Sequence, residues 1–187
     1  MGKRIIIGIT GASGVIYGIR ALELLHKAEV ETHLIISTVA RTIITQETEW
    51  KVNQVEKLAS VSYQPEEMGA PLASGSFHID GMAVIPCSIK TLSAIANSYA
   101  NDLIVRAADV TLKEGKPLVL VVRETPLHRG HIRLMDLASR AGAIIFPPVP
   151  VLYGKPSSLD EMISDTAGRV LLRLGIENVG YTKWKGM

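Results

Sequence analysis

The sequence has few of the features that mark disulfide-rich, membrane or nucleic-acid-binding proteins. Its one cysteine, Cys87, excludes an intrachain disulfide framework and is typical of a reducing compartment. Lys and Arg number 20 against 18 Asp and Glu, without a dense basic tract, which argues against nucleic acids or membrane surfaces as partners. No apolar run approaches the roughly 20 residues of a membrane span, and Ile5 to Ile7 is too short for a signal peptide. We therefore expect a cytoplasmic protein.

The composition is that of a folded protein. Hydrophobic residues make up 47% of the chain and charged residues 20%, which excludes a disordered chain. The 187 residues are enough to bury a core and correspond to roughly one domain. Because no linker or internal repeat interrupts the chain, we predict one domain over residues 1–187. The mean hydropathy of +0.24 is high and indicates surface that becomes buried between subunits.

Short β-branched runs alternate with amphipathic stretches along the whole chain. The runs predict strands at 3–9, 32–37, 81–86, 116–123 and 143–146, and helical spacing predicts helices at 15–25, 39–52, 89–99, 102–114, 127–141 and 158–174. Turn-forming residues at 65–76 predict a loop. Nearly continuous apolar strands that alternate with helices are typical of a parallel sheet covered on both faces. The predicted fold is a three-layer, doubly wound α/β sheet of the Rossmann or flavodoxin type.

In such a sheet, ligands bind beyond the carboxyl ends of the strands. The first strand is followed by a glycine-rich turn, Gly8 to Gly14, which opens into a helix and could present backbone N–H groups to an anion. Its spacing is G-x-x-G-x-x-G rather than G-x-G-x-x-G, so a plain tight turn remains an alternative. The second strand ends at Ser37 without the acidic residue that binds a nicotinamide ribose, which disfavours NAD.

Polar residues also follow the later strands. After the third, Ser88 has two explanations, a helix N-cap or part of a wall of donors with Lys90 and Thr91. Arg123 and Glu124 end the very apolar fourth strand, where a charged pair is unusual. Other reactive or charged residues have plainer explanations.

Cys87 is expected to pack in the core, and Arg106, Lys113 and Arg169 lie on predicted helices, where they could simply face solvent. Tyr153 ends a proline-rich loop, where its hydroxyl could meet an anion. The five histidines lack metal-ligand spacing, so no zinc site is predicted.

Five segments together resemble the UbiX/Pad family of flavoproteins. They are Thr-Gly-Ala-Ser-Gly at 10–14, Pro-Cys-Ser-Ile-Lys-Thr-Leu-Ser at 86–93, Asn-Asp-Leu-Ile-Val-Arg-Ala-Ala-Asp-Val at 101–110, Val-Arg-Glu-Thr-Pro-Leu at 122–127 and Pro-Pro-Val-Pro-Val-Leu-Tyr at 147–153. The spacing from the last segment to Arg169 also fits, so the likeness covers nearly the whole chain.

The resemblance implies a flavin prenyltransferase that needs no metal. Such an enzyme joins a dimethylallyl group from dimethylallyl phosphate to N5 and C6 of reduced FMN. The product is the prenylated-FMN cofactor of a partner UbiD-type decarboxylase. The family's site lies between subunits of a dodecamer. The sequence does not distinguish a monophosphate from a diphosphate donor, nor a ubiquinone pathway from one that degrades phenolic acids.

The resemblance also implies roles for individual residues. The flavin-binding positions fall on Gly11, Ala12, Ser13, Ser37, Ser88, Ile89, Lys90, Thr91 and Arg123. The prenyl phosphate positions fall on Tyr153 and Arg169, with Arg106 and Lys113 nearby as catalytic cations. The two active-site glutamates fall on Glu47 and Glu124, and Trp184 aligns with an aromatic residue that could cap the allyl group. Lys90 is the weakest of these assignments, since some members lack a basic residue there.

Three other functions remain as alternatives. Older descriptions of the family give an aromatic-acid decarboxylase subunit, but the chain lacks an obvious group to stabilise an aryl carbanion. A decarboxylase of cysteinyl carboxylates needs a catalytic histidine, whereas His26 and His33 lie away from the predicted strand ends. A flavodoxin-like electron carrier would not need cations for a second phosphate.

Overall fold

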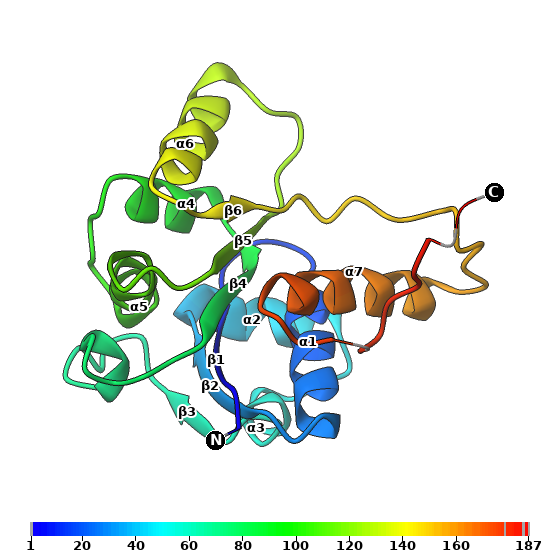
Figure 1. The fold of residues 1–187 in the computed structure, drawn as a ribbon, viewed down its shortest axis with the longest axis horizontal. Coiled ribbons are helices and arrows are strands. Elements are labelled where there is room, and N and C mark those ends of the chain that lie inside the picture. The colour runs from blue at the N-terminus through cyan, green and yellow to red at the C-terminus, as the bar shows by residue number, and fades with distance from the viewer. Residues whose placement is uncertain (1, 178, 185, 187) are drawn as a thin grey trace.

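Six parallel strands form the centre of the fold, in the spatial order β3-β2-β1-β4-β5-β6 (Figure 1). The computed structural model describes residues 2–177, 179–184 and 186. The strands are β1 (Arg4–Ile9), β2 (Glu31–Ile36), β3 (Val61–Tyr63), β4 (Gly81–Cys87), β5 (Leu118–Val122) and β6 (Ile144–Ile145). The strand order reverses between β1 and β4, and a Rossmann-type sheet binds its ligand at such a reversal.

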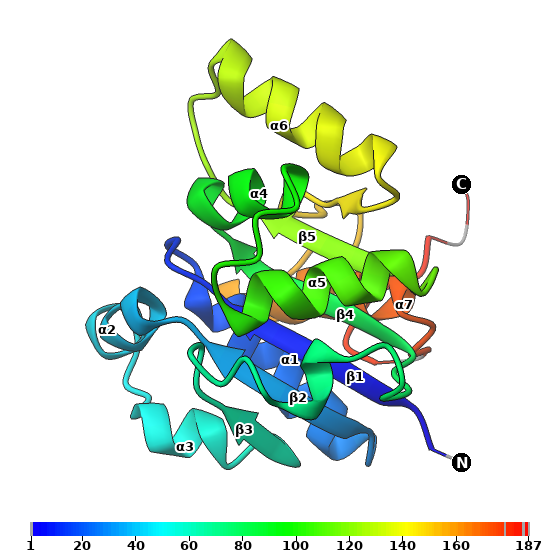
Figure 2. The ribbon, with the colours of Figure 1, turned by 90° about the vertical axis from the view of Figure 1, so that its left-hand side faces the viewer.

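Helices cover both faces of the sheet (Figures 1 and 2). They are α1 (Val15–Lys27), α2 (Thr38–Glu47), α3 (Val52–Glu56), α4 (Ile89–Ala96), α5 (Leu103–Lys113), α6 (Arg129–Arg140) and α7 (Leu159–Arg173), with a short 3-10 helix η1 (Pro71–Ala73). Helices α1 and α7 pack together on one face, whereas α4 and α5 lie on the other with α6 outside α4. The three-layer doubly wound fold predicted from the sequence is confirmed. None of the helices within the described residues is long and apolar enough to cross a membrane.

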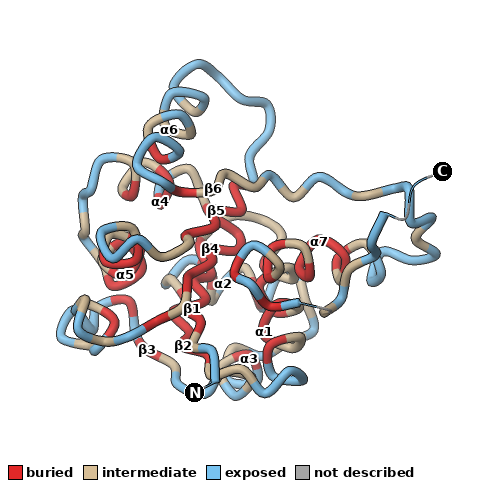
Figure 3. Tube along the Cα trace, in the orientation of Figure 1, coloured by how far each residue is buried: buried red, intermediate tan, exposed pale blue. Residues whose placement is uncertain are grey.

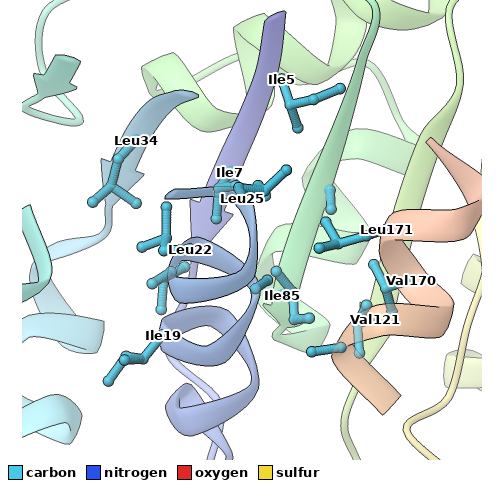
Figure 4. Packing of buried hydrophobic residues seen from close by; sticks show 14 of the residues in the cluster. Ile5, Ile7, Ile19, Leu22, Leu25, Leu34, Ile85, Val121, Val170 and Leu171 are labelled. Carbon is cyan, nitrogen blue, oxygen red and sulfur yellow. The ribbon is translucent and has the colours of Figure 1, made fainter. Parts of the chain in front are cut away.

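The core lies in two layers because successive strand residues point to opposite faces. In β1, Ile5, Ile7 and Ile9 pack toward α1 and α7, while Ile6 packs toward α5. Figure 4 shows Leu22 and Leu25 of α1 meeting the first of these layers, and Figure 3 shows that the central strands and the inner faces of α1, α5 and α7 are buried. Both faces of the sheet are therefore apolar, which explains why the strands read as continuous hydrophobic runs.

Apart from shifted element ends and the short helix η1 within the predicted loop at 65–76, the structure differs from the sequence prediction in two places. The edge strand β3 was not predicted, because Val61–Tyr63 is too short to give a period-two signal. The predicted helix at 39–52 is broken into α2 and α3. Its break has a local cause, since the hydroxyl of Thr48 donates to the carbonyl of Ile44 and accepts the N–H of Trp50. A threonine side chain that bonds nearby backbone in this way competes with the helical ladder.

The buried His33 of β2 makes the stability of the fold depend on pH. His33 is 3% exposed, and its ring lies 3.0 Å from both the Tyr63 hydroxyl and the Glu31 carboxylate. Burial lowers the pKa of His33 from its ordinary 6.5, although Glu31 opposes the shift. As the pH falls below 6.5, the unfolded chain therefore binds a proton that the folded chain does not. We expect the free energy of unfolding to decrease by at most about 1.4 kcal/mol per pH unit from this group.

Denaturant titrations of the unmodified protein and of His33→Gln between pH 7.5 and 5.5 test this expectation. The variant removes the titrating group, so its stability should depend less steeply on pH. Equal slopes in the two proteins would contradict it.

Candidate functional site

One pocket lies at the carboxyl edge of the sheet, where β1 and β4 lie side by side. Its volume of about 600 Å³ is in the range of cofactor sites. The wall after the strands is formed by Gly11, Ala12, Ser13, Ser37, Thr38, Val39, Ser88, Ile89, Lys90, Thr91, Arg123 and Glu124, and the surrounding wall by Pro65, Glu66, Ala94, Asn101, Asp102 and Val105. All nine residues predicted to bind the flavin thus line one pocket, although the sequence separates them by more than a hundred positions.

Thr10 joins the two loops that form the centre of this pocket. Its side chain is buried, its hydroxyl donates to the carbonyl of Pro86 at 2.8 Å, and the hydroxyl oxygen accepts the N–H of Ser88 at 2.8 Å. Its backbone N–H also donates to Pro86. The glycine turn after β1 is therefore fixed to the turn after β4. Sequence reasoning missed Thr10, because one threonine at a strand end carries no signal for a cross-loop bond.

Several helices begin at the pocket. Ser37 caps α2 by accepting the N–H of Ala40, and Ser88 caps α4 by accepting the N–H of Thr91. The N-cap explanation of Ser88 is therefore confirmed, and the residue lines the pocket as well. Asp102 caps α5 in the same way, by accepting the N–H of Val105, and was not among the predicted site residues. The amino-terminal ends of helices carry partial positive charge, so their convergence favours an anionic ligand such as a phosphate.

The glycine turn lets the backbone approach the pocket. A Cβ on Gly11 would lie 2.9 Å from a methyl carbon of Val39, and Gly14 has a φ of +95° that suits only glycine well. The Glu47 carboxylate accepts the N–H of Gly14 at 2.8 Å. Glu47 therefore does not line the pocket of its own chain, and its carboxylate holds the glycine turn in place.

The charges of the pocket are unevenly placed. Lys90 and Arg123 both line it and are exposed, and within the described part of the chain neither forms an ion pair. Glu124 lies next to Arg123, and one of its carboxylate oxygens accepts the N–H of Thr125. Cys87 is buried behind the wall, and burial raises the pKa of its thiol, so this cysteine packs rather than reacts. Two cations without ion pairs are thus available to an anion, in a pocket that Glu124, Glu66 and Asp102 also line.

Three other predicted residues lie outside this pocket, on α7 and on the segments before and after it. The rings of Tyr153 and Trp184 meet edge to face with centroids 5.2 Å apart, and the Tyr153 hydroxyl donates to the carbonyl of Thr182 at 3.4 Å. The guanidinium of Arg169 lies 5.9 Å from the ring centroid of Phe146, at the start of the proline-rich loop. Tyr153 and Trp184 are 46% and 56% exposed. In one chain, Tyr153 and Trp184 thus form an exposed aromatic pair, and Arg169 lies beside Phe146.

Within one chain, Arg106 and Lys113 make their contacts elsewhere, whereas the resemblance places the family's site between subunits. Arg106 donates to the carbonyl of Ala73 at 3.1 Å and pairs with Asp109 at 3.0 Å, so it faces η1. Lys113 pairs with Glu114 at the carboxyl end of α5. Only the amino-terminal end of α5 reaches the pocket, and a helix of this length places its last residue about 16 Å away.

The comparisons with known proteins agree with this arrangement. Residues 1–166 match the Flavoprotein family. The flavin prenyltransferase UbiX of Escherichia coli strain K12 is 50% identical over 188 residues, which cover 98% of this chain and 99% of that protein. The solved structure of AnUbiX (PadA1) in complex with FMN and dimethylallyl pyrophosphate matches with a TM-score of 0.98 and 44% identity over 100% of both chains.

A second solved structure is a dodecameric FMN-dependent UbiX-like decarboxylase from Escherichia coli O157:H7. It matches with a TM-score of 0.94 and 43% identity, covering 98% of this chain and 100% of that chain. The matched lengths include both the pocket and α7. The chain therefore belongs to the Flavoprotein family and, within it, to the UbiX-type flavin prenyltransferases.

Proposed function

We propose that this enzyme joins the dimethylallyl group of dimethylallyl phosphate to N5 and C6 of reduced FMN. The observation that carries the proposal is the pocket itself, in which every predicted flavin-binding residue meets at the strand-order reversal. The names of the relatives favour this reaction over decarboxylation of an aromatic acid. The product would serve a UbiD-type decarboxylase, and the single buried cysteine and balanced charge support a cytoplasmic location.

The residues present fit FMN. A pocket of about 600 Å³ with glycine-turn backbone, three serine hydroxyls and the cations Lys90 and Arg123 offers donors for a phosphate and for flavin carbonyls. When bound, reduced FMN supplies the nucleophilic N5 and the ring carbon C6. The chain's own part is to hold the ring plane still and to exclude water from it, since positioning can lower a barrier by several kcal/mol.

The prenyl phosphate would bind the group around α7. Breaking the allylic C–O bond leaves negative charge on the phosphate, where Arg169 can donate and where the Tyr153 hydroxyl can donate after it turns from the Thr182 carbonyl. Charge-assisted hydrogen bonds contribute about 1.5–3 kcal/mol each. The indole face of Trp184 can stabilise the allyl cation by about 0.5–2 kcal/mol. These side chains would take the place that a metal ion holds in many allylic transferases.

A neighbouring copy of the chain would complete the site. Large apolar side chains are exposed along the proline-rich loop and the start of α7, among them Val149 at 66%, Leu152 at 68% and Leu159 at 69%. Exposed apolar patches mark contact surfaces, and the high mean hydropathy has the same explanation. Arg106 and Lys113, which their own chain keeps from the pocket, would reach it across such a contact. A dodecameric relative supports an assembly of this kind.

Mixing two inactive variants tests the shared site. Lys113→Ala and Glu124→Gln would each slow turnover strongly in uniform assemblies. When the two are unfolded and refolded together, some sites combine an intact Lys113 from one chain with an intact Glu124 from another. We expect turnover to return in the mixture above that of either parent. A mixture no faster than its parents would mean that each site is built from one chain.

Glu124 is the carboxylate best placed to accept the proton that leaves C6. It lines the pocket, and its backbone-bonded oxygen leaves the second oxygen available. The Glu47 carboxylate already accepts the N–H of Gly14, so a substitution of Glu47 would change activity through the shape of the glycine turn. A carboxylate in this position acts as a general base, with the released phosphate as the competing acceptor.

Anaerobic reconstitution tests the proposed reaction. The purified protein is loaded with FMN, reduced without oxygen and mixed with dimethylallyl phosphate or, separately, the diphosphate. We expect release of inorganic phosphate from the monophosphate and a flavin that carries five additional carbon atoms. Recovery of unmodified FMN with no phosphate released would overturn the proposal. Decarboxylation of an aromatic acid by the protein alone would instead support the older description of the family.

Replacing Thr10 by valine tests how the flavin pocket is held. Valine has nearly the same shape but leaves the partly buried N–H of Ser88 without its acceptor, at a cost of about 1–3 kcal/mol. We expect FMN to bind roughly tenfold more weakly in a flavin fluorescence titration. Thr111→Val is the matched control, because that buried hydroxyl donates to Ala107 inside α5. An unchanged FMN affinity in Thr10→Val would show that the cross-loop bond does not shape the pocket.

A further inference from the structure

Asp165 is a buried acid that the proposed reaction does not use. It lies on the inner side of α7 and is 8% exposed. One carboxylate oxygen accepts the backbone N–H of Thr182 at 2.8 Å. The other is buried and has no hydrogen-bond partner within the described part of the chain. Burying a carboxylate is costly, so this residue needs an explanation beyond packing.

The segment that Asp165 holds, residues 179–184, is called the C-terminal strap here. It lies directly on α7, because a Cβ added to Gly168 would be 2.1 Å from the carbonyl oxygen of Val179. It also meets α1, where a Cβ on Gly180 would be 2.7 Å from Leu24, and Gly180 has a φ of +67°. Two glycines thus allow the strap to lie in contact with both helices, and Figure 1 shows it beside α7. The Asp165 bond fixes where along α7 the strap lies.

The strap supplies Trp184 of the candidate prenyl-donor group and contacts Tyr153. Its Thr182 carbonyl accepts the Tyr153 hydroxyl at 3.4 Å, and its Trp184 ring meets the Tyr153 ring at 5.2 Å with planes 71° apart. Asp165 and Arg169 are four residues apart on α7, so they share one face of that helix. A chain of contacts therefore runs from Asp165 through Thr182 to the two aromatic residues, beginning one turn from Arg169.

We propose that Asp165 is a positioning residue for the prenyl donor: its bond to Thr182 fixes the strap, and the strap fixes Tyr153 and Trp184 near the helix face that carries Arg169. This inference rests on the proposed function, since it assumes that this group binds the donor. Asp165 does not line the flavin pocket. Its removal should therefore affect the donor and spare FMN, whereas a residue with a merely structural role would affect both.

The experiment uses the full chain with Trp50 replaced by phenylalanine, so that Trp184 is the only tryptophan. Asp165→Ala removes the acceptor, and Asp165→Asn keeps an oxygen that can accept the Thr182 N–H. Asp160→Ala is the control, because it removes an exposed acid from the first turn of the same helix. Gly168→Ala displaces the strap while it keeps Asp165, and it replaces Asp165→Ala if that variant does not fold. Each protein is measured for acrylamide quenching of Trp184, FMN affinity and KM for dimethylallyl phosphate.

We expect Asp165→Ala to raise Trp184 quenching and to raise KM for dimethylallyl phosphate about tenfold, with FMN affinity within about twofold of the parent. Asp165→Asn should restore both donor readouts. The proposal is overturned if quenching or KM stays unchanged in Asp165→Ala, if FMN affinity falls by as large a factor as KM rises, or if Asp165→Asn behaves like alanine. A failure of the proposed function can be told apart from a failure of this inference, because the parent protein itself would then form no prenylated flavin.

Discussion

Glu124→Gln is expected to lower kcat by about 10²–10⁴-fold, the usual contribution of a general base. Glutamine has the same shape and can still accept the Thr125 N–H, so the loop after β5 should keep its conformation. It cannot take up the proton that leaves C6. FMN affinity should stay within about threefold, since Arg123 and the glycine turn remain. Single-turnover kinetics with prebound reduced FMN measure the change directly.

The matched control for this variant is Glu66→Gln, which neutralises another carboxylate that lines the same pocket. Its turnover should stay close to that of the unmodified protein. Loss of FMN binding in Glu124→Gln would make Glu124 a structural residue. Equal slowing in both variants would attribute the effect to the charge of the pocket rather than to proton transfer.

The second large effect is expected at Arg169. Arg169→Met keeps the apolar stem that lies over Phe146 and removes the donors to the phosphate. Losing charge-assisted hydrogen bonds of about 1.5–3 kcal/mol should raise KM for dimethylallyl phosphate about 10- to 100-fold. FMN binding should not change, because Arg169 does not line the flavin pocket.

Arg173→Met is the control for this variant, since Arg173 is exposed in the last turn of the same helix. It should leave KM unchanged. An unchanged KM in Arg169→Met would remove Arg169 from the donor site. A change in FMN affinity instead would mean that Arg169 also contributes to the flavin pocket.

The parts of the site that follow strands could be predicted from the sequence, for a physical reason. In a parallel sheet all carboxyl ends lie on one edge, so Ser13, Ser88 and Arg123 had to meet once the strands were recognised. The same rule does not predict where side chains on the helices lie relative to the pocket. Lys113 was assigned by resemblance, and the length of α5 then places it at the end of that helix far from its own chain's pocket.

Residues that act through hydrogen bonds between distant segments could not be predicted. Thr10 bonds Ser88 across 78 positions, and Asp165 bonds Thr182 across 17. Neither pair has a spacing that a helix or strand would impose, so no periodicity reveals it. The short strand β3 was missed for a related reason, because its pairing with β2 rather than its own pattern makes it a strand.

The central claim is that the pocket brings a flavin and a prenyl donor together so that two bonds form at defined flavin atoms. The most direct measurement is NMR of the flavin extracted after anaerobic reaction with dimethylallyl phosphate labelled with ¹³C at all five carbons. We expect labelled carbons bonded to N5 and to C6 in one product, formed by the unmodified protein and strongly slowed in Glu124→Gln. A label that remains in free dimethylallyl alcohol or phosphate, with FMN recovered unchanged, would contradict the account.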